Sequence, residues 1–342
     1  MNDYYSGLTQ EKKAYFHILE PNFPNWLHKY INTPVMLHQQ YISTTCGLIY
    51  TKLIGENTFY SSLDHSVGVA LIVWHFTKDK KQTIAALLHD IATPVFKHCV
   101  DFLEGDHLTQ ESTEGRTTEK IRNSAELMNL LKRDHINVAE IDNYHIYPIA
   151  DNETPHLAAD RLEYSFANAF FTYHMIDLAK IEEIYKDIEI QKNEKKIPEL
   201  GFKTKKIARD FVKITSQLST LYRNPTDVFS MQFLADILKK LEQIGKITRD
   251  EMYVLKEKEI INIIEKSEYK DIFSKWRTAK EIKISKEKPD NVYAVKENVK
   301  IRWIDPLFQG QRMSKVCKIA KKYIDKNLAY TVDEYIYLDF DL

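Results

Sequence analysis

The sequence predicts a mainly α-helical protein with a small antiparallel α+β unit at its C-terminal end. Glycine and proline are scarce, with 9 and 10 in 342 residues, which favours helices over a β-sandwich. Apolar residues recur at helical spacing through about residue 275. Beyond residue 276, several segments alternate apolar and polar residues, as half-buried strands do. We therefore divide the chain into a helical domain, 1–275, and an α+β unit, 276–342.

The helical domain contains two strongly apolar segments and several amphipathic ones. Leu63 to Phe76 predicts a buried helix, and Ile84 to Ala92 predicts a second. Thr93-Pro94 ends the second helix and is expected to begin another, with Thr93 as its N-cap. Thr154-Pro155 repeats this pattern and is expected to open a helix that runs to about Ile176. Further helices are predicted at 178–192, 205–222, 227–244 and 248–265.

Two polar segments, 104–119 and Lys192–Gly201, are expected to be loops. The C-terminal unit is expected to hold one helix, at about 311–325, among four strands. These strands are predicted at Glu281–Ser285, Val292–Val295, Val299–Ile304 and Tyr335–Phe340.

Composition excludes several classes of protein. Lysine and arginine total 48 against 49 acidic residues, so the balance gives no strong nucleic-acid signal and no attraction to an anionic membrane. Three widely spaced cysteines without a CxxC pair argue against a disulfide framework. No secretory signal is evident, and no stretch reaches the roughly 18 apolar residues of a membrane span. We expect a cytoplasmic protein with no membrane partner, either a monomer or a homo-oligomer.

His89-Asp90 is the first candidate for a functional site, because it closes an apolar run, Ile84–Leu88. Two adjacent ionisable side chains are costly to bury unless something binds them. Imidazole and carboxylate are both ligands of divalent cations. For an isolated pair, a hydrogen-bonded histidine beside an aspartate is the alternative. His65 and Asp160 lie on two other apolar helices, and all four side chains could converge on one cation inside a bundle.

Three short blocks resemble the HD-domain phosphohydrolase superfamily, in particular its deoxynucleoside triphosphate triphosphohydrolase-like branch. They are HSVGVA from residue 65, ALLHDIATPVFKHCVDF from residue 86 and ADRLEY from residue 159. The resemblance covers roughly residues 30–235. It implies an HD-domain helical bundle with one divalent metal ion held by His65, His89, Asp90 and Asp160. These donors suit Mn, Fe, Ni, Zn or Mg about equally well.

The resemblance also implies catalytic residues beyond the metal. His98 and Asp101 are three residues apart, so they share a helix face, and an aspartate that orients a histidine is a common acid–base arrangement. An ordinary pair on a helix surface is the alternative. His107 and Glu111, in the polar loop, are second candidates, with solvated loop residues as the alternative.

Substrate-binding candidates follow Asp160. Arg161, Tyr164 and Asn168 lie one, four and eight residues further on. The resemblance implies that these positions meet the phosphates and sugar of a nucleotide, although Asn168 replaces an acidic residue. Arg223 is a further phosphate-binding candidate, with an ordinary surface arginine as the alternative.

Two other positions depart from the resembled family. Ser62 stands where its members have a phosphate-binding arginine, and Thr45 stands where they have a glutamine that reads the nucleoside. We therefore expect a divalent-metal-dependent phosphohydrolase that cleaves a phosphoester of a small phosphorylated substrate, a nucleotide, with shifted specificity. A catalytically silent metal- and nucleotide-binding regulatory module is the alternative.

Other functions receive less support from the sequence. The chain lacks a GYP motif and has Thr93 where some two-metal sites place a histidine, which disfavours a cyclic-dinucleotide phosphodiesterase. The neutral charge balance disfavours a nuclease. Residues 302–312, with Arg302 and Arg312, are expected to form a surface unit, and a cap over the site or a subunit contact is the alternative.

Overall fold

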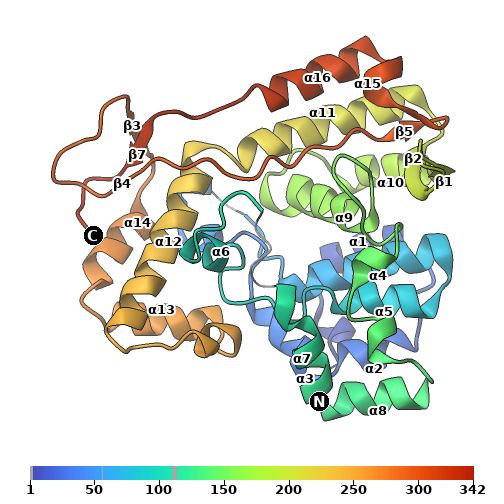
Figure 1. The fold of residues 1–342 in the computed structure, drawn as a ribbon, viewed down its shortest axis with the longest axis horizontal. Coiled ribbons are helices and arrows are strands. Elements are labelled where there is room, and N and C mark those ends of the chain that lie inside the picture. Colours follow the sequence, from blue (N-terminus) through green and yellow to red (C-terminus); the bar gives the residue numbers. More distant parts are fainter. Residues whose placement is uncertain (1–2, 56, 110–113) are drawn as a thin grey trace.

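The computed structural model describes residues 3–55, 57–109 and 114–342, and this part of the chain is mainly α-helical (Figure 1). The prediction of a mainly α-helical protein is therefore confirmed. Its α-helices are α1 (Gln10–Leu19), α2 (Leu27–Ile31), α3 (Pro34–His38), α4 (Ser62–Thr77), α5 (Lys80–Leu88), α6 (Cys99–Leu103), α7 (Thr117–Asn123), α8 (Ala125–Arg133), α9 (Ala159–Ala167), α10 (Leu178–Lys186), α11 (Lys205–Leu221), α12 (Pro225–Gln243), α13 (Glu257–Glu265), α14 (Lys270–Thr278), α15 (Met313–Val316) and α16 (Lys318–Leu328).

The strands of the described residues are short and form two sheets. They are β1 (Ile188–Lys192), β2 (Pro198–Phe202), β3 (Lys283–Ser285), β4 (Ala294–Val295), β5 (Leu307–Phe308), β6 (Gln311–Arg312) and β7 (Tyr335–Tyr337). One sheet has the order β3-β7-β4 and is antiparallel. The other has the order β1-β2-β5-β6, in which β2 and β5 run parallel. Residues 276–342 therefore contribute to both sheets.

Two hydrophobic cores organise the helices. The first lies around α1, α4, α5, α9 and α11, and the second lies around α12, α13, α14 and the β3-β7-β4 sheet. Helices α11 and α16 run side by side along one edge of the molecule (Figure 1). Between β4 and β5 the chain crosses from one sheet toward the other. The site described below lies where elements of the two cores meet.

The strand predicted at Val299–Ile304 is wrong. This segment is extended but has no strand partner among the described residues. Val299 and Ile304 are nevertheless 8% and 3% exposed, because Val299 joins the second hydrophobic core and Ile304 joins the first. The alternation of apolar and polar residues therefore predicted neither the strand pairing nor the full burial pattern, because Ile301 is 39% exposed.

The helix predicted at 178–192 is confirmed only as far as Lys186, and the loop predicted at Lys192–Gly201 is wrong from Pro198 onward. Helix α10 ends at Lys186, and β1 and β2 then form an antiparallel hairpin in which Ile188 pairs with Phe202. The outer edge of β2 pairs with β5, which lies far along the chain. Such a tertiary contact leaves no local sequence pattern.

Helices were predicted to begin at the two Thr-Pro pairs and at residue 248, and these starts are wrong. Helix α9 begins at Ala159, where backbone carbonyls of Ile149 and Ala150 accept its first amides. Helix α6 begins at Cys99, after Phe96 and Lys97 adopt positive φ angles of 57° and 46°. Near residue 248 a 3-10 turn, Asp250–Tyr253, precedes α13.

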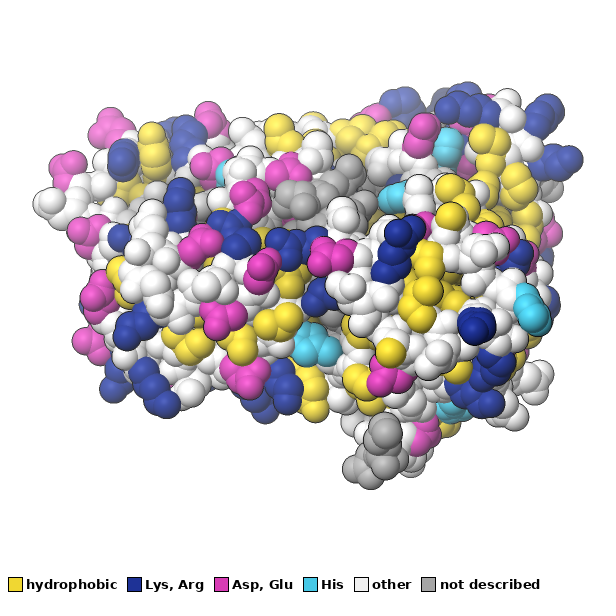
Figure 2. Space-filling view, turned by 60° about the horizontal axis from the view of Figure 1, so that its bottom comes forward, with side chains coloured by type: hydrophobic (Ala, Val, Ile, Leu, Met, Phe, Trp, Pro, Cys, Tyr) yellow, Lys and Arg dark blue, Asp and Glu magenta, His cyan; other side chains and the backbone are white. Residues whose placement is uncertain are grey.

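The surface carries charges of both signs. Figure 2 shows lysine, arginine and acidic side chains interspersed on the face in view, without a broad basic area. The three cysteines in the described part of the chain are free thiols. None of the described helices combines the length and apolar character needed to cross a bilayer.

Glu257 joins three segments beside the site. Its Oε1 accepts hydrogen bonds from the backbone amides of Ser43 and Phe96, both at 3.1 Å. Its Oε2 accepts one from the hydroxyl of Tyr50 at 2.8 Å. Burial raises the pKa of Glu257 to about 7, although these hydrogen bonds oppose the shift.

Glu257→Gln is expected to become more stable relative to the wild type as the pH rises from 5 to 7. A carboxyl whose pKa is raised in the folded state stabilises the fold below its unfolded pKa, and this contribution is lost as pH rises through the folded pKa. Between the two pKa values the difference changes by about 1.4 kcal/mol per pH unit. Urea unfolding at several pH values measures it, and a difference independent of pH would contradict the prediction.

Candidate metal centre

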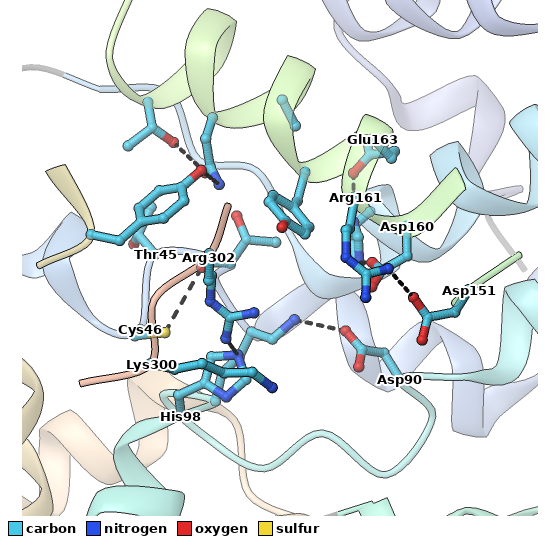
Figure 3. A pocket seen from close by; sticks show the side chains of 18 of the residues that line it. Thr45, Cys46, Asp90, His98, Asp151, Asp160, Arg161, Glu163, Lys300 and Arg302 are labelled. Carbon is cyan, nitrogen blue, oxygen red and sulfur yellow. Dashed lines mark hydrogen bonds and ion pairs between the residues drawn. The ribbon is translucent and has the colours of Figure 1, made fainter. Parts of the chain in front are cut away.

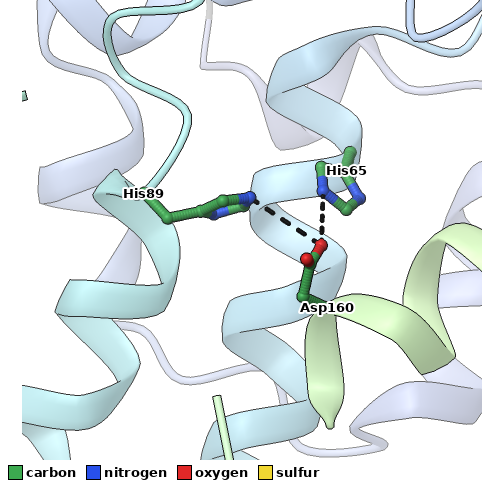
Figure 4. Close-up of side chains that lie close together, drawn as sticks. All are labelled: His65, His89 and Asp160. Atoms are coloured by element: carbon green, nitrogen blue, oxygen red, sulfur yellow. Dashed lines mark ion pairs between the residues drawn. The ribbon is translucent and has the colours of Figure 1, made fainter. Parts of the chain in front are cut away.

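Three of the four predicted metal ligands converge (Figure 4). His65 lies on α4, His89 follows α5 and Asp160 lies in the first turn of α9, and their candidate ligand atoms are all within 4.8 Å of one another. Asp160 Oδ1 lies 3.1 Å from His65 Nε2 and 4.0 Å from His89 Nε2. Both rings therefore present the same nitrogen to one carboxylate oxygen.

The outer nitrogen of each ring has a partner that can only accept a hydrogen bond. His65 Nδ1 donates to Glu163 Oε2 at 2.5 Å, and His89 Nδ1 donates to the carbonyl of Ala86 at 2.7 Å. Each Nδ1 therefore carries a proton, and each Nε2 faces the cluster, where it can bind a cation once it is deprotonated. Such outer partners orient histidine ligands in metal sites. Two imidazoles and a carboxylate in this arrangement fit a divalent cation.

Two carboxylates surround His65. Burial disfavours its charged form, but Glu163 and Asp160 raise the pKa of His65 to about 10. Burial likewise opposes ionisation of Asp160, but the hydrogen bond and charge of His65 have a larger combined effect and lower the pKa of Asp160. A proton on His65 balances the charge of the carboxylates in the metal-free site, and a divalent cation would take its place.

The fourth predicted ligand, Asp90, lies beside the cluster and is paired with a lysine. Its Oδ1 is 3.7 Å from His89 Nε2, and its Oδ2 is 2.7 Å from Lys97 Nζ. The hydroxyl of Ser62 also donates to Oδ2, at 3.4 Å. Burial opposes ionisation of Asp90, but Lys97 and the histidines hold the pKa of Asp90 well below its usual range. A cation at the cluster and Lys97 would therefore compete for this carboxylate.

An unusual turn precedes α6 and carries Lys97. Phe96 and Lys97 both have positive φ angles, which side chains larger than glycine rarely adopt. The amide of Phe96 is held by Glu257. Strained backbone of this kind concentrates at functional sites, and here it accompanies the lysine that meets Asp90.

A cavity of about 660 Å³ opens beside the cluster (Figure 3), a volume typical of small-molecule sites. Asp160, Arg161, Asp151 and Asp90 lie at one end of the cavity, and Cys46 lies at the other. Residues 299–302 form part of its wall. Thr45 lies at the end with Cys46, and burial and the nearby charge of Asp227 both raise the pKa of the Cys46 thiol. Contacts from Asp227 to Tyr173, from Tyr173 to Tyr222 and from Tyr222 to Asn168 continue this wall, and the cavity lining also includes Leu48, Thr172 and Met231.

The structure brings the predicted pair His98 and Asp101 together. His98 Nδ1 lies 2.9 Å from Oδ2 of the buried Asp101, and His98 Nε2 lies 3.2 Å from Nη2 of Arg302. Burial, with Arg302 and Lys97, lowers the pKa of His98, although Asp101 opposes the shift. His98 lines the cavity, and the lowered pKa favours its neutral form.

The three predicted substrate-binding residues of the α9 region all line the cavity. Arg161 Nη1 donates to Asp151 Oδ1 at 2.6 Å. Asn168 Nδ2 donates to the hydroxyl of Tyr222 at 2.9 Å. Tyr164 lies between them along the helix. Asn168 begins a π-helical turn, Asn168–Thr172, a feature that often occurs at functional sites.

Other predicted site residues lie elsewhere. His107 Nε2 contacts Gln232 Oε1 at 2.9 Å, and His107 is not among the described residues that line the cavity. Arg223 is buried and donates to the carbonyls of Asn327 and Tyr330, which ties α11 to the end of α16. Glu111 lies outside the described residues.

Several residues of the site were not among those predicted from the sequence. Lys97 directly precedes His98, and Glu163 lies three residues after Asp160 on the same helix, so both were detectable as neighbours of predicted residues. His145 is 2.7 Å from Asp151, which also binds Arg161, and both line the cavity. No sequence pattern around His145 and Asp151 indicates that they line the cavity.

Comparisons with known proteins found two relatives. The chain is 23% identical to the uncharacterized protein YdhJ of Bacillus subtilis over 273 residues, 79% of this chain and 81% of YdhJ. It is 25% identical to the metal-dependent phosphohydrolase cns2 of Cordyceps militaris over 134 residues, 38% of this chain and 37% of cns2. No family model matches the chain. The chain is thus distantly similar to a metal-dependent phosphohydrolase and has a His/Asp cluster that could hold a metal.

Gly68→Ala is expected to weaken metal binding about 10- to 100-fold, the usual effect of disturbing a partner of a ligand. A Cβ at Gly68 would lie 2.5 Å from Glu163 Oε1 and 2.7 Å from Glu163 Cγ, so Glu163 must leave His65. Calorimetric titration with Mn²⁺ measures the change. Gly7→Ala is the control, because nothing lies within 4 Å of its added Cβ. Equal affinities in both variants would contradict the prediction.

Proposed function

We propose that the protein is an HD-domain metal-dependent phosphohydrolase that cleaves a phosphoester bond of a nucleotide. The observation that carries the proposal is the cluster of His65, His89 and Asp160, whose Nε2 atoms and carboxylate face one point. The cluster adjoins a cavity of suitable size. Similarity to the metal-dependent phosphohydrolase cns2 supports the same chemistry.

His65, His89 and Asp160 would hold one divalent ion, with Asp90 as a fourth ligand. The bound ion supplies a Lewis acid that polarises a phosphoryl oxygen and activates water. Four protein ligands leave room in an octahedral shell for water and substrate.

Positive charge at the same end of the cavity would hold the phosphate. Lys97 and Arg161 both line the cavity, and each is paired with a carboxylate, Asp90 and Asp151 respectively. A phosphate oxygen offers each cation a charge-assisted hydrogen bond, which is among the stronger kinds. Lys97 thus places a cation beside Ser62, where the sequence lacks the arginine expected from the resemblance.

His98 would move the proton. Asp101 fixes its ring by binding Nδ1, and Nε2 is unprotonated at neutral pH because burial and Arg302 lower the pKa of His98. A neutral Nε2 would accept the proton of the attacking water in place of the hydrogen bond from Arg302 Nη2, and would return it to the leaving oxygen, as a general base and acid does.

Product analysis tests the proposal. Chelator-treated protein is given Mn²⁺ and a panel of dNTPs, NTPs, nucleoside monophosphates and simple phosphoesters. We expect metal-dependent release of phosphate or tripolyphosphate from a nucleotide. Metal binding without any product would overturn the proposal in favour of a silent binding module.

A further inference from the structure

We propose that Asp227, in the part of the cavity away from the metal cluster, accepts a hydrogen bond from an N–H group on a planar ring of the substrate. Asp227 lies in the first turn of α12 and lines the cavity. The inference rests on the proposed function in one respect, which is that the phosphate occupies the end beside His65 and Asp160.

Helix α9 sets the distance between the two ends. Asp160, Tyr164 and Asn168 follow one another at four-residue spacing and line the cavity. At 1.5 Å per residue, Asn168 lies about 12 Å along the helix from Asp160. Beyond Asn168, the hydroxyl of Tyr173 donates to Asp227 Oδ1 at 3.2 Å. A phosphate at the cluster therefore leaves room for a sugar and a ring before Asp227 is reached.

The carboxylate of Asp227 lacks full compensation from the protein. The residue is 4% exposed, and no hydrogen-bond donor in the described part of the chain reaches its Oδ2. Burial raises the pKa of Asp227 to about 7, and hydrogen bonds from Tyr173 and Asn224 oppose the shift only in part. A buried carboxylate that lacks a cation is costly, and a ligand donor would remove part of this cost.

The surroundings of Asp227 favour a planar ring. Tyr173 and Tyr222 both line this part of the cavity, with ring centroids 6.4 Å apart, and Leu48 and Met231 add apolar surface. Aromatic and apolar walls pack against flat rings. A carboxylate among them selects a ring that carries an N–H donor, because hydrogen bonds to a charged acceptor are stronger than neutral ones.

Nucleoside binding tests the inference. Dissociation constants are measured by equilibrium dialysis for adenosine against purine riboside, which lacks the amino group, and for uridine against 3-methyluridine, which lacks the ring N–H. The proteins are the wild type, Asp227→Ala and Asp227→Asn. Asp236→Asn is the matched control, because Asp236 also lies on α12 and accepts a tyrosine hydroxyl, that of Tyr293 at 2.6 Å, but does not line the cavity.

We expect the wild type and Asp236→Asn to prefer the donor-bearing member of at least one pair by about 10-fold or more. The preference should vanish in Asp227→Ala. Asp227→Asn, which keeps a neutral acceptor in the first turn of α12, should retain a reduced preference even if the alanine variant melts early. Equal binding within both pairs, no nucleoside binding, or an unchanged preference in Asp227→Ala would overturn the inference.

The same measurement separates this inference from the proposed function. The nucleosides carry no phosphate, so their binding does not depend on hydrolysis. A protein that hydrolyses phosphoesters without any preference within the pairs would refute the role of Asp227 alone. A protein that shows the preference but releases no phosphate would refute the hydrolase alone.

Discussion

Asp160→Asn is expected to abolish metal binding and to lower metal-dependent hydrolysis at least about a thousandfold, since a bound cation contributes several kcal/mol to the barrier. Oδ1 of Asp160 is the atom that both histidine Nε2 atoms face. Asparagine preserves the size of the side chain but removes its charge. Metal content after dialysis and the rate of phosphate release measure the two effects.

Asp236→Asn is the control for this substitution too. It makes the same change on α12, at a residue that pairs with Tyr293 outside the cavity lining, and should keep both metal and activity. If Asp160→Asn retained stoichiometric metal, the three-residue cluster would not be the metal site.

Lys97→Met is expected to change metal and phosphate binding in opposite directions. Lys97 occupies Asp90 Oδ2 at 2.7 Å, so its removal leaves the carboxylate to a cation, and Mn²⁺ should bind at least as tightly as to the wild type. Orthophosphate should bind the Mn²⁺-loaded protein about 10- to 100-fold more weakly, because a charge-assisted hydrogen bond is lost. Two calorimetric titrations, first with Mn²⁺ and then with phosphate, measure these changes.

Lys12→Met is the matched control for Lys97→Met. Lys12 likewise pairs with an aspartate, the buried Asp64, at 2.7 Å, and its side chain is 12% exposed against 11% for Lys97, but it does not line the cavity. This variant should leave both affinities unchanged. Weaker Mn²⁺ binding in Lys97→Met, or unchanged phosphate binding, would exclude the proposed role of Lys97.

Local pattern was enough to locate the helices that carry the cluster. The apolar runs around His65 and before His89 became α4 and α5, and Asp160 lies on a predicted helix. Long apolar segments with helical spacing are the most dependable signals in a single sequence. The order of the histidines and aspartates then indicated that they meet, and three of them do.

Features that depend on tertiary contacts were not predictable. The β2–β5 pairing joins distant segments, and residues 299–302 alternate like a strand but form a wall of the cavity. Asp227 belongs to an ordinary amphipathic helix in sequence, and only the fold places it in the cavity. Arg223 is the opposite case. The sequence made it a candidate phosphate ligand, but in the fold it binds backbone carbonyls of the C-terminal segment.

Ser62 and Thr45, two residues that differ from the resembled family, both lie at the site. The hydroxyl of Ser62 contacts Asp90, and Thr45 lines the cavity while its hydroxyl pairs with that of Ser43 at 2.8 Å. Both side chains are shorter than the arginine and glutamine of the resembled family, and Lys97 and Asp227 supply charge at the two ends of the same cavity. This arrangement supports a shifted substrate preference.

The most direct measurement is the initial rate of phosphate or tripolyphosphate release from the best substrate of the panel, as chelator-treated protein is titrated with Mn²⁺. The proposed function predicts that the rate is negligible without metal, rises to saturation with Mn²⁺ in the wild type and stays negligible in Asp160→Asn. A rate that is independent of added metal, or equal in the variant, would contradict it.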